Sequence, residues 1–309
     1  MDERVVFIDG QYVPESEARI SVFDHVVLYG DGVFETAVAW NGRIFRLEEH
    51  VDRLFKSMAA VGIEAPYSRK DLRELILETV RRNGLPNAYV KWLVTRGSNG
   101  TPLLDPRGCK ASCIILVRPY LYMTSPERVQ NGVRVKTVAI RRPPGDVLDA
   151  KVKSLNYLNL VLAKMEAVAA GADEALLLNT QGRVCEAPGY NVFVSTAGSL
   201  RTPAEDILEG ITRDTVFEMA SEMNLPCSAA SLSLYDVYVA DEVFLCSTAG
   251  GIIPVVQVDG RVIGAGVPGP VTRSITAAYM EILATDPRSA AVPGLVGVST
   301  AAGAPLQAG

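Results

Sequence analysis

Lys153 stands directly before a run of apolar residues at helical spacing. This run predicts a buried helix that ends near Gly171, with an apolar face of Leu155, Leu158, Val161, Leu162, Met165 and Val168. A lysine at the point where a loop enters a buried helix costs free energy unless it has an ion-pair partner or a chemical role. Two interpretations are open. Lys153 is a solvated surface lysine, or its amine forms a Schiff base with a cofactor aldehyde.

Length and composition are those of an ordinary globular protein. The 309 residues suffice for two domains, 48% are hydrophobic and 21% are charged. The net charge is −5 and no block of basic residues stands out, which argues against nucleic acid as a partner. No apolar run reaches the roughly 18 residues of a membrane span, and the N-terminus lacks a signal-peptide core. We therefore expect a cytoplasmic protein without a membrane partner.

Cysteine and histidine are too few and too scattered for a metal centre. The five cysteines, at 109, 113, 185, 227 and 246, lack paired metal-ligand spacing, so we expect reduced and mostly buried thiols. The only histidines are His25 and His50, which is little material for a metal site or a Ser-His-Asp triad. The chemistry is therefore expected to depend on lysine, carboxylates and a cofactor, with no metal.

The first half of the chain mixes strands and helices. Two hairpins are predicted at 4–13 and around 40–44, with a loop over 20–36 between them. Apolar spacing predicts helices over 47–58 and 69–83, and strands follow over 88–96 and 111–118. This is an α+β pattern, and we expect a small N-terminal domain over residues 1–119.

The second half predicts a larger domain. Residues 120–131 are expected to form an interdomain loop and 132–284 a cofactor-binding domain. The predicted strands of that domain lie over 133–140, 174–178, 183–194 and 242–245. From about residue 285 the chain consists mainly of Ala, Gly, Ser, Pro and Val, so 285–309 is predicted to be a disordered tail.

Two features of this half favour a charged ligand. Glu186 interrupts an apolar strand directly before a Pro-Gly pair, and a carboxylate there needs either an arginine or a protonated ring nitrogen as its partner. Gly210 precedes a predicted helix whose free amides can bind an anion, with Thr212 as the expected N-cap. A loop of small residues at 246–251 has the same potential for close backbone approach.

Six stretches, taken together and in order, resemble one family. They are YGDGVFET (29–36), FRLEEHVDRL (45–54), KSLNYLNLVLAKMEA (153–167), EAPGYNVF (186–193), LEGITRD (208–214) and ADEVFLCSTAG (240–250). The chain is similar to the class IV, fold-type IV aminotransferases, which use pyridoxal 5′-phosphate, and most similar to the branched-chain amino acid group. The resemblance implies a mixed α/β fold with a small N-terminal domain and a larger, β-barrel-like C-terminal domain. It also implies a homodimer or a higher homo-oligomer.

The resemblance also implies residue roles. Lys153 is similar to the lysine that carries the cofactor and moves the proton, and Lys151 does not align with it. Tyr157 is similar to the tyrosine on the cofactor's phenolic oxygen, and Glu186 to the carboxylate on its ring nitrogen. The remaining cofactor-binding positions are Arg53, Asn191, Ile211, Thr212 and Thr248. The substrate positions are Tyr29, Phe34, Val38, Tyr89, Lys91, Tyr120, Ala249 and Gly250.

Several positions depart from the branched-chain pattern. Val38 and Lys91 stand where arginines are usual, and Tyr190 stands where many members have an acidic residue. Where the family has an aromatic pair in the interdomain loop, this chain has Tyr120 and the non-aromatic Met123. The stretches around Tyr190 and before Lys153 also resemble the (R)-selective amine transaminases.

These departures leave alternatives open. The resemblance implies transfer of an amino group between a hydrophobic, branched-chain amino acid and a 2-oxo acid. The alternatives are an (R)-amine or D-amino acid transaminase with pyruvate as acceptor, a lyase of the aminodeoxychorismate type, and a non-catalytic homologue. The preferred donor, its enantiomer and the acceptor depend on loop geometry that the sequence does not show.

Overall fold

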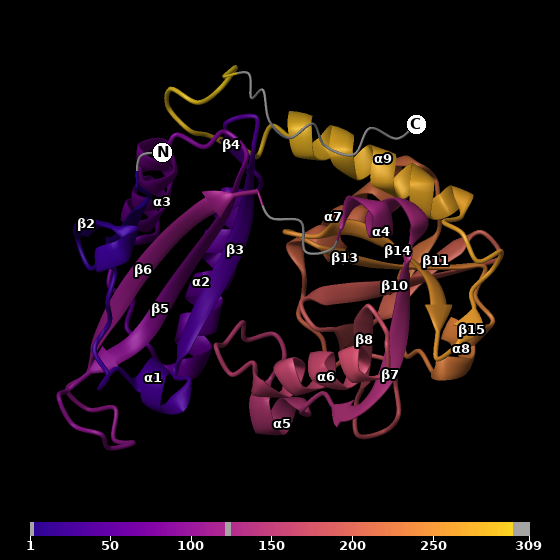
Figure 1. Cartoon of the computed structure of the whole chain (residues 1–309), viewed down its shortest axis with the longest axis horizontal. Coiled ribbons are helices and arrows are strands. Elements are labelled where there is room, and N and C mark those ends of the chain that lie inside the picture. Colours follow the sequence, from indigo (N-terminus) through magenta and orange to yellow (C-terminus); the bar gives the residue numbers. More distant parts are fainter. Residues whose placement is uncertain (1–2, 121–124, 299–309) are drawn as a thin grey trace. The chain divides into compact units, whose positions relative to one another are not determined.

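The computed structural model describes residues 3–120 and 125–298, which fall into two compact units (Figure 1). Among these residues, the first unit comprises 3–120, 152–156 and 283–298, and the second comprises 125–151 and 157–282. Lys153 thus belongs to the first unit although its neighbours Lys151 and Tyr157 belong to the second. This differs from the sequence-based boundaries, which placed 152–156 in the C-terminal domain.

The first unit is built on a seven-stranded sheet. The strand order is β16-β4-β3-β5-β6-β1-β2, and neighbouring strands are antiparallel. The bounds are β1 Val5–Ile8, β2 Gln11–Pro14, β3 Gly32–Trp40, β4 Arg43–Ile44, β5 Ala88–Ser98, β6 Lys110–Pro119 and β16 Ala290–Ala291. Both predicted hairpins are confirmed by the β1–β2 and β3–β4 pairs.

Two amphipathic helices pack on this sheet. Helix α2 (Leu47–Val61) is longer than its prediction, whereas α3 (Arg69–Asn83) has the predicted bounds because Ser68 caps its start and Gly84 ends it. Their apolar faces join the sheet residues in one core. The alternation of β3 directs Val33 and Ala37 into that core, and it leaves Phe34 and Thr36 on the opposite face.

The predicted loop over 20–36 is partly wrong. The segment contains a short helix, α1 (His25–Tyr29), and the first part of β3. Asp24 caps the helix by accepting a hydrogen bond from the Val26 amide, and Gly30 ends it with φ = 68°. A five-residue helix is too short to give a periodic apolar signal, so it was missed.

The predicted disordered tail is wrong for residues 285–298. Ala290 and Ala291 pair with β4, and Val292 and Leu295 lie in the core of the first unit. The buried guanidinium of Arg46 donates to Asp286 at 3.0 Å. Low charge and small residues suggested disorder, but these residues gain their order from partners about 240 positions earlier in the chain. Residues 299–309 lie outside the described residues.

The second unit is built on a nine-stranded sheet. The main strand order is β12-β11-β10-β13-β14-β7-β8, with β15 on β14 and β9 on β10. The bounds are β7 Val133–Arg141, β8 Glu174–Leu178, β9 Glu186–Ala187, β10 Tyr190–Thr196, β11 Ser199–Pro203, β12 Cys227–Ala230, β13 Glu242–Ser247, β14 Gly251–Val258 and β15 Arg261–Val262. Apolar residues from several of these strands form one core cluster.

The helices of this unit are α4 Pro126–Asn131, α5 Gly145–Leu148, α6 Leu158–Ala169, α7 Ile211–Glu222, α8 Leu234–Tyr238 and α9 Pro270–Thr285. Helix α9 continues past the sequence boundary between the units at residue 282. Met123, expected in an aromatic pair, lies outside the described residues. No helix in the described part of the chain has the length and apolarity needed to cross a membrane.

The apolar face predicted for the helix after Lys153 is not buried. Helix α6 packs on β7 and β8 through Leu160, Ala163 and Ala167, and the two alanines are small enough to permit close approach. The predicted face instead is exposed: Leu158, Val161, Leu162, Met165 and Val168, with 70% of Leu158 and 61% of Met165 accessible. Both stripes have helical spacing, so periodicity alone did not decide which one faces the sheet.

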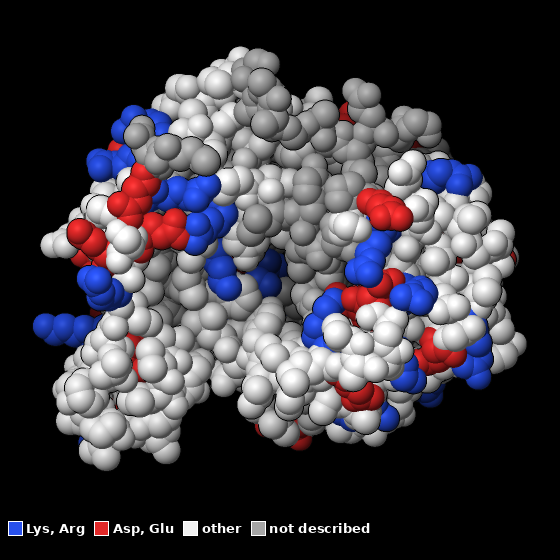
Figure 2. Space-filling view, viewed as in Figure 1, with Lys and Arg blue, Asp and Glu red and all other residues white. Residues whose placement is uncertain are grey.

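Charged side chains of both signs are intermixed on the surface. Figure 2 shows Lys and Arg close to Asp and Glu on the visible face of each unit. Ion pairs between side chains of opposite sign include Arg81–Glu78 and Arg201–Asp236.

Candidate active site

The backbone of Lys153 is fixed by the open edge of β3. Strand β4 pairs only with the end of β3, so residues 32–36 have a free edge, which residues 153–155 occupy. The Phe34 amide donates to the Lys153 carbonyl at 2.9 Å, and the Leu155 amide donates to the Gly32 carbonyl at 2.8 Å. The Lys153 amide donates to Ser57 Oγ on α2 at 3.2 Å. This pairing holds Lys153 at one position of the first unit.

Two lysine amines lie over one aromatic ring. Lys153 Nζ is 4.6 Å from the centre of the Phe34 ring, and Lys91 Nζ is 4.5 Å from the same centre. Both contacts are within cation–π range. Burial, and then repulsion by Lys153, lower the pKa of Lys91 below its ordinary value. Phe34, Lys91 and Lys153 therefore lie together in this unit, and the substrate roles of Phe34 and Lys91 stay predictions.

Strand register brings more of the predicted substrate residues to the same sheet face. In the β3–β5 pair Thr36 is opposite Lys91, and Val38 is opposite Tyr89. Residues directly opposite in an antiparallel pair share a face. The Tyr89 hydroxyl lies 3.5 Å from Thr36 Oγ1, and Val38 is buried.

The other predicted tyrosines of this unit have different surroundings. The Tyr29 hydroxyl donates to the Pro102 carbonyl at 2.8 Å, which ties α1 to the loop after β5. Tyr120 packs edge-to-face on Trp40, with ring centres 5.6 Å apart. These contacts anchor both tyrosines within the first unit.

Arg53 is held by a buried carboxylate that sequence analysis did not single out. Glu35 has no exposed surface and accepts from Arg53 Nε at 2.6 Å and from Arg53 Nη2 at 2.9 Å. It also lies 2.8 Å from His50 Nδ1. Burial would raise the pKa of Glu35, but the Arg53 guanidinium and the His50 ring hold it far below its usual range. Burial is the main cause that lowers the pKa of His50.

The signal that could have found this cluster was present in the sequence. Glu35 lies between the core residues Val33 and Ala37 at every second position of β3, so all three side chains point to the same face. This spacing predicts an inward carboxylate that needs a cation. Helix α2 places His50 and Arg53 three positions apart, on one helix face. Only the fold shows that Glu35 of β3 meets His50 and Arg53 of α2, because these residues belong to separate elements.

In the second unit Glu186 is buried, and each of its carboxylate oxygens lies close to a donor group. The Leu208 amide donates to Glu186 Oε2 at 2.9 Å, and Arg142 Nε lies 2.8 Å from Glu186 Oε1. The Arg142 contact is an ion pair by distance, although Nε has no aligned hydrogen bond. The arginine partner, one of the two partners that the sequence suggested for Glu186, is therefore present. Contact of Glu186 with a ring nitrogen stays a prediction. Arg142 itself was missed because nothing in its sequence surroundings marks it.

Asn191 lies opposite Glu186 in the β9–β10 hairpin and shapes the same turn. Its Nδ2 donates to the Leu208 carbonyl at 2.8 Å. A Cβ on Gly210 would lie 2.1 Å from Asn191 Oδ1, so only glycine fits at that position. Together Glu186 and Asn191 fix the chain directly before α7.

The start of α7 differs from its prediction. Gly210, not Thr212, is the N-cap, and no side chain caps the helix. Thr212 is instead the second helical residue, and its Oγ1 lies 3.4 Å from Thr248 Oγ1. The predicted residues Ile211, Thr212 and Thr248 therefore come together around a helix start whose amides have no side-chain cap. Such an arrangement is typical of an anion site.

The turn after β13 places Ala249 and Gly250. Ala249 is buried, and the Gly250 amide donates to Ser247 Oγ at 2.9 Å. A Cβ on Gly250 would lie 2.5 Å from the ring of Tyr190. Tyr190, one of the departures from the family pattern, thus supports this turn by direct packing.

Tyr157 and Lys151 have peripheral positions in the second unit. Tyr157 is the N-cap residue of α6 and packs partly buried against the core beneath that helix. Lys151 is exposed and lies 3.4 Å from Asp149. Lys151 and Lys153 thus belong to different units, and a chemical role for Lys153 alone stays a prediction.

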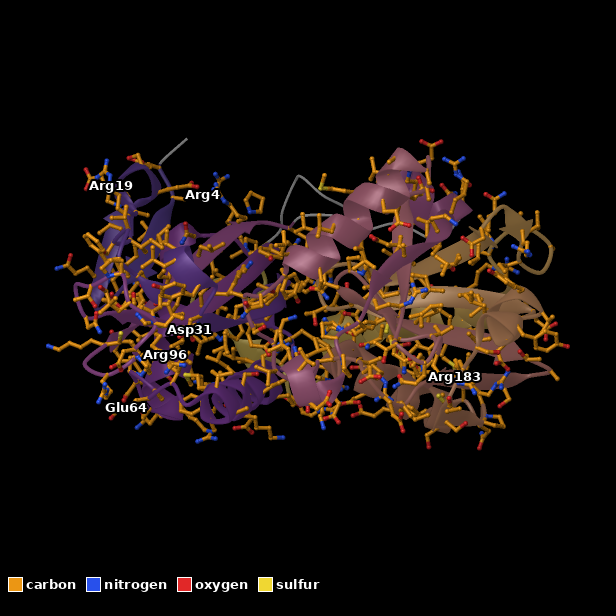
Figure 3. The ribbon with its side chains drawn as sticks, turned by 90° about the horizontal axis from the view of Figure 1, so that it is seen from below. Arg4, Arg19, Asp31, Glu64, Arg96 and Arg183 are labelled. Carbon is orange, nitrogen blue, oxygen red and sulfur yellow. The ribbon has the colours of Figure 1, made fainter. Side chains whose placement is uncertain are left out.

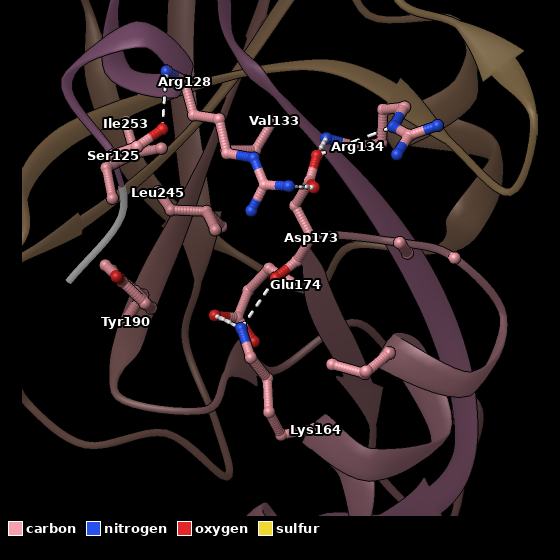
Figure 4. A pocket seen from close by; sticks show the side chains of 13 residues that line it. Ser125, Arg128, Val133, Arg134, Lys164, Asp173, Glu174, Tyr190, Leu245 and Ile253 are labelled. Atoms are coloured by element: carbon pink, nitrogen blue, oxygen red, sulfur yellow. Dashed lines mark hydrogen bonds and ion pairs between the residues drawn. The ribbon is translucent and has the colours of Figure 1, made fainter.

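A cavity of about 620 Å³ lies within the second unit. Figure 4 shows Arg128 and Arg134 directed at Asp173, and Lys164 at Glu174. Burial raises the pKa of Glu174, and the Lys164 ammonium opposes that shift. The basic groups of this wall are therefore already paired with the acidic ones. No cluster of three or more His, Cys, Asp and Glu side chains within 3–120 and 125–298 could hold a metal ion.

Comparisons with known proteins agree on one family. The family model for Amino-transferase class IV matches residues 32–258. A putative branched-chain-amino-acid aminotransferase of Methanocaldococcus jannaschii is 43% identical over 282 residues, which cover 90% of this chain and 96% of that protein.

Two solved structures share the fold. The branched-chain aminotransferase of Thermoproteus uzoniensis, solved with norvaline, is 36% identical with a TM-score of 0.86, covering 91% of this chain and 95% of that one. The branched-chain amino acid aminotransferase of Escherichia coli is 30% identical with a TM-score of 0.89, covering 92% of this chain and 95% of that one. The mixed α/β fold with two sheets matches both.

Proposed function

Because the chain belongs to the class IV aminotransferases, we propose that it transfers the amino group of hydrophobic, branched-chain L-amino acids to a 2-oxo acid. The observation that carries the proposal is the position of Lys153. Its backbone is fixed on the edge of β3, and its amine lies over Phe34 beside the second amine of Lys91. The activities for which the compared proteins are named support the donor class.

Pyridoxal 5′-phosphate is the proposed cofactor, and the donor groups fit it. The uncapped start of α7, with Thr212 and Thr248 beside it, suits a phosphate group. Gly210 leaves room there that a Cβ would fill. Glu186 supplies a buried negative charge for a protonated ring nitrogen, and Lys153 supplies the amine that binds the aldehyde. Arg53, Tyr157 and Asn191 are the further proposed cofactor-binding residues.

The chain's own residues perform the remaining steps. When bound, the cofactor supplies an electron-accepting ring for the electrons left at the substrate Cα. Lys153 Nζ would hold the cofactor and, as a free amine, would take the proton from the substrate Cα and deliver it to the cofactor's C4′ carbon. Glu186 keeps the ring nitrogen protonated, because a negative charge in a dry site favours the N–H form. Glu35 holds the Arg53 guanidinium in one orientation, which serves positioning.

The proposed partners are small molecules, an amino acid and a 2-oxo acid, and a second copy of this chain. The exposed stripe of α6 supports self-association, since five neighbouring apolar side chains are unusual on a monomer's surface.

A Leu158→Glu/Met165→Glu double variant should shift the size-exclusion position toward the monomer. Val262→Glu, at a similarly exposed apolar residue of β15, serves as control. Unchanged elution of the double variant would contradict the proposed surface. Cytoplasmic location stays a prediction.

The activity test uses the purified protein supplied with pyridoxal 5′-phosphate. L-leucine and an (R)-arylamine are offered singly with 2-oxoglutarate or pyruvate, and D-alanine is offered with 2-oxoglutarate. The new amino acid is measured by chromatography. Fastest turnover of L-leucine supports the proposal. Faster turnover of D-alanine with 2-oxoglutarate, or of the (R)-arylamine with pyruvate, would replace it by the alternative that Val38, Lys91 and Tyr190 suggested.

A matched pair of lysine variants tests the residue assignment. Lys153→Ala should abolish transamination, whereas Lys151→Ala should retain it, because Lys151 is exposed and its recorded ion pair is with Asp149. Trapping with borohydride followed by peptide mass spectrometry should find the cofactor on Lys153. Cofactor attached to another lysine would refute the assignment.

A further inference from the structure

A cysteine, a histidine and an aspartate of the first unit form a chain of contacts outside the proposed transaminase site. Cys109 Sγ lies 3.6 Å from His25 Nε2, and His25 Nδ1 lies 3.6 Å from Asp31 Oδ2. The His25 ring is 1% exposed, whereas Cys109 is half-buried. A thiol on one ring nitrogen and a carboxylate on the other is the order of groups that activates a nucleophile.

Three separate parts of the fold hold these groups in place. His25 opens α1, and the N-cap Asp24 is anchored by the Thr95 hydroxyl at 2.8 Å. Asp31 follows α1 and accepts from the Arg96 guanidinium at 3.1 Å; Figure 3 labels both residues in the same part of the first unit. Arg96 is itself fixed by the Val61 carbonyl at 2.7 Å. The histidine and the carboxylate are therefore preorganised.

The thiol belongs to a different segment from His25 and Asp31. Cys109 ends the loop that connects β5 to β6, and its amide donates to the Pro106 carbonyl at 3.1 Å. His25 Nε2 thus faces the thiol whose proton it can accept, and Asp31 faces the other ring nitrogen.

The other four cysteines lack such a setting. Cys113, Cys185 and Cys246 are buried, and burial raises the pKa of Cys113 and of Cys185 to about 12. Burial also raises the pKa of Cys227 to about 11, and that of Cys246 far above its ordinary value. These thiols stay protonated at neutral pH, so they form an internal comparison for Cys109.

We propose that Cys109 is a nucleophilic thiol, activated by His25 and Asp31, that peroxide-class oxidants convert to a sulfenic acid. The thiolate sulfur attacks one oxygen of hydrogen peroxide, an S–O bond forms and the O–O bond breaks. Sulfur gives up two electrons, and the hydroxide that leaves takes the proton of His25 to become water. A second thiol of the glutathione class then displaces water from the sulfenic acid to form a mixed disulfide.

Modification of Cys109 has a route to the proposed substrate residues. The Tyr29 ring packs edge-to-face on His25 at 5.2 Å, and the Tyr29 hydroxyl binds Pro102 in the loop that ends at Cys109. An adduct on the sulfur must displace His25 or the loop, and either change moves Tyr29. This consequence rests on the proposed function, because Tyr29 is a substrate residue only there.

The test is a competition among the five thiols of the cofactor-loaded protein. Iodoacetamide is added below stoichiometry at pH 7, and peptide mass spectrometry measures the fraction alkylated at each cysteine. Cys109 should react at least roughly tenfold faster than each of the other four. Hydrogen peroxide followed by dimedone should mark the same residue. Equal rates at Cys109 and half-buried Cys227, or no dimedone product on Cys109, would overturn the proposal.

Variants separate activation from simple exposure. His25→Gln should slow alkylation of Cys109 by roughly tenfold, because the amide cannot take the thiol proton. Labelling of buried Cys113 in the same sample reports any loosening of the fold, so a destabilised variant is recognised. If His25→Gln folds and Cys109 still reacts at the original rate, exposure alone explains the reactivity and the activation by His25 is refuted.

The transaminase assay is a separate readout. Peroxide treatment should raise KM for the amino donor in the original protein but not in Cys109→Ser. An unchanged KM after complete oxidation of Cys109 would refute the link to Tyr29. Alkylation rates require no transaminase activity, so failure of the proposed function leaves the thiol measurement interpretable.

Discussion

Removal of the buried Glu35 carboxylate is the perturbation whose cost the structure defines best. In Glu35→Gln the side chain keeps its size, but Arg53 and His50 lose their shared anion. Glu35 has no exposed surface, and Arg53 is 13% exposed, so water compensates little of the loss. Breaking a buried ion pair by removal of one partner costs about 3–5 kcal/mol. We expect a loss near the lower end of that range, because the guanidinium retains some solvent.

The matched control lies on the same helix. Asp52 of α2 pairs with Arg69 at 3.0 Å, and both side chains are more than half exposed. An exposed pair contributes less than about 1 kcal/mol, so Asp52→Asn should leave the free energy of unfolding nearly unchanged. Urea unfolding followed by circular dichroism measures both variants. A loss below about 1 kcal/mol in Glu35→Gln would refute the energetic importance of the cluster.

The same cluster predicts how stability depends on pH. The pKa values of His50 and Glu35 are both lower in the folded state than in the unfolded chain. Each group therefore contributes stability that is complete above its unfolded pKa and is lost as pH falls toward the folded value. The loss should begin below about pH 6.5 for His50 and continue below about pH 4.3 for Glu35. In Glu35→Gln the second part should disappear.

Three further outcomes follow from particular contacts. Gly210→Ala should weaken retention of pyridoxal 5′-phosphate in equilibrium dialysis, because its Cβ would meet Asn191 at 2.1 Å. The control Gly145→Ala should leave retention unchanged, because the nearest atom to its Cβ would be 3.9 Å away. Asp286→Asn should lower the free energy of unfolding by about 3 kcal/mol, since it leaves the buried Arg46 without this carboxylate, and an unchanged urea midpoint would contradict the packing of residues 286–298. Lys153→Ala should raise the pKa of Lys91, measured by NMR of ¹³C-methylated lysines, because a repelling charge is removed; an unchanged pKa would separate the two amines.

Local patterns in the sequence were sufficient for elements whose signal lies within a short window. Helix α3 has its predicted bounds because Ser68 and Gly84 mark its ends, and alternating residues marked β5 and β6. The six motifs, taken together and in order, were sufficient for the family, which the comparisons then showed. Lys153 could be singled out because a lysine beside an apolar run is a local anomaly.

Contacts between distant parts of the chain were decided only by the tertiary structure. The orientation of α6 depended on which of two apolar stripes packs more closely on the sheet, and small residues prevailed. Residues 286–298 are ordered by Arg46 and β4, and Cys109 meets a histidine 84 positions earlier. Periodicity and composition report a residue's immediate surroundings along the chain. They cannot report a partner from another element, because that partner is chosen by the packing of the whole unit.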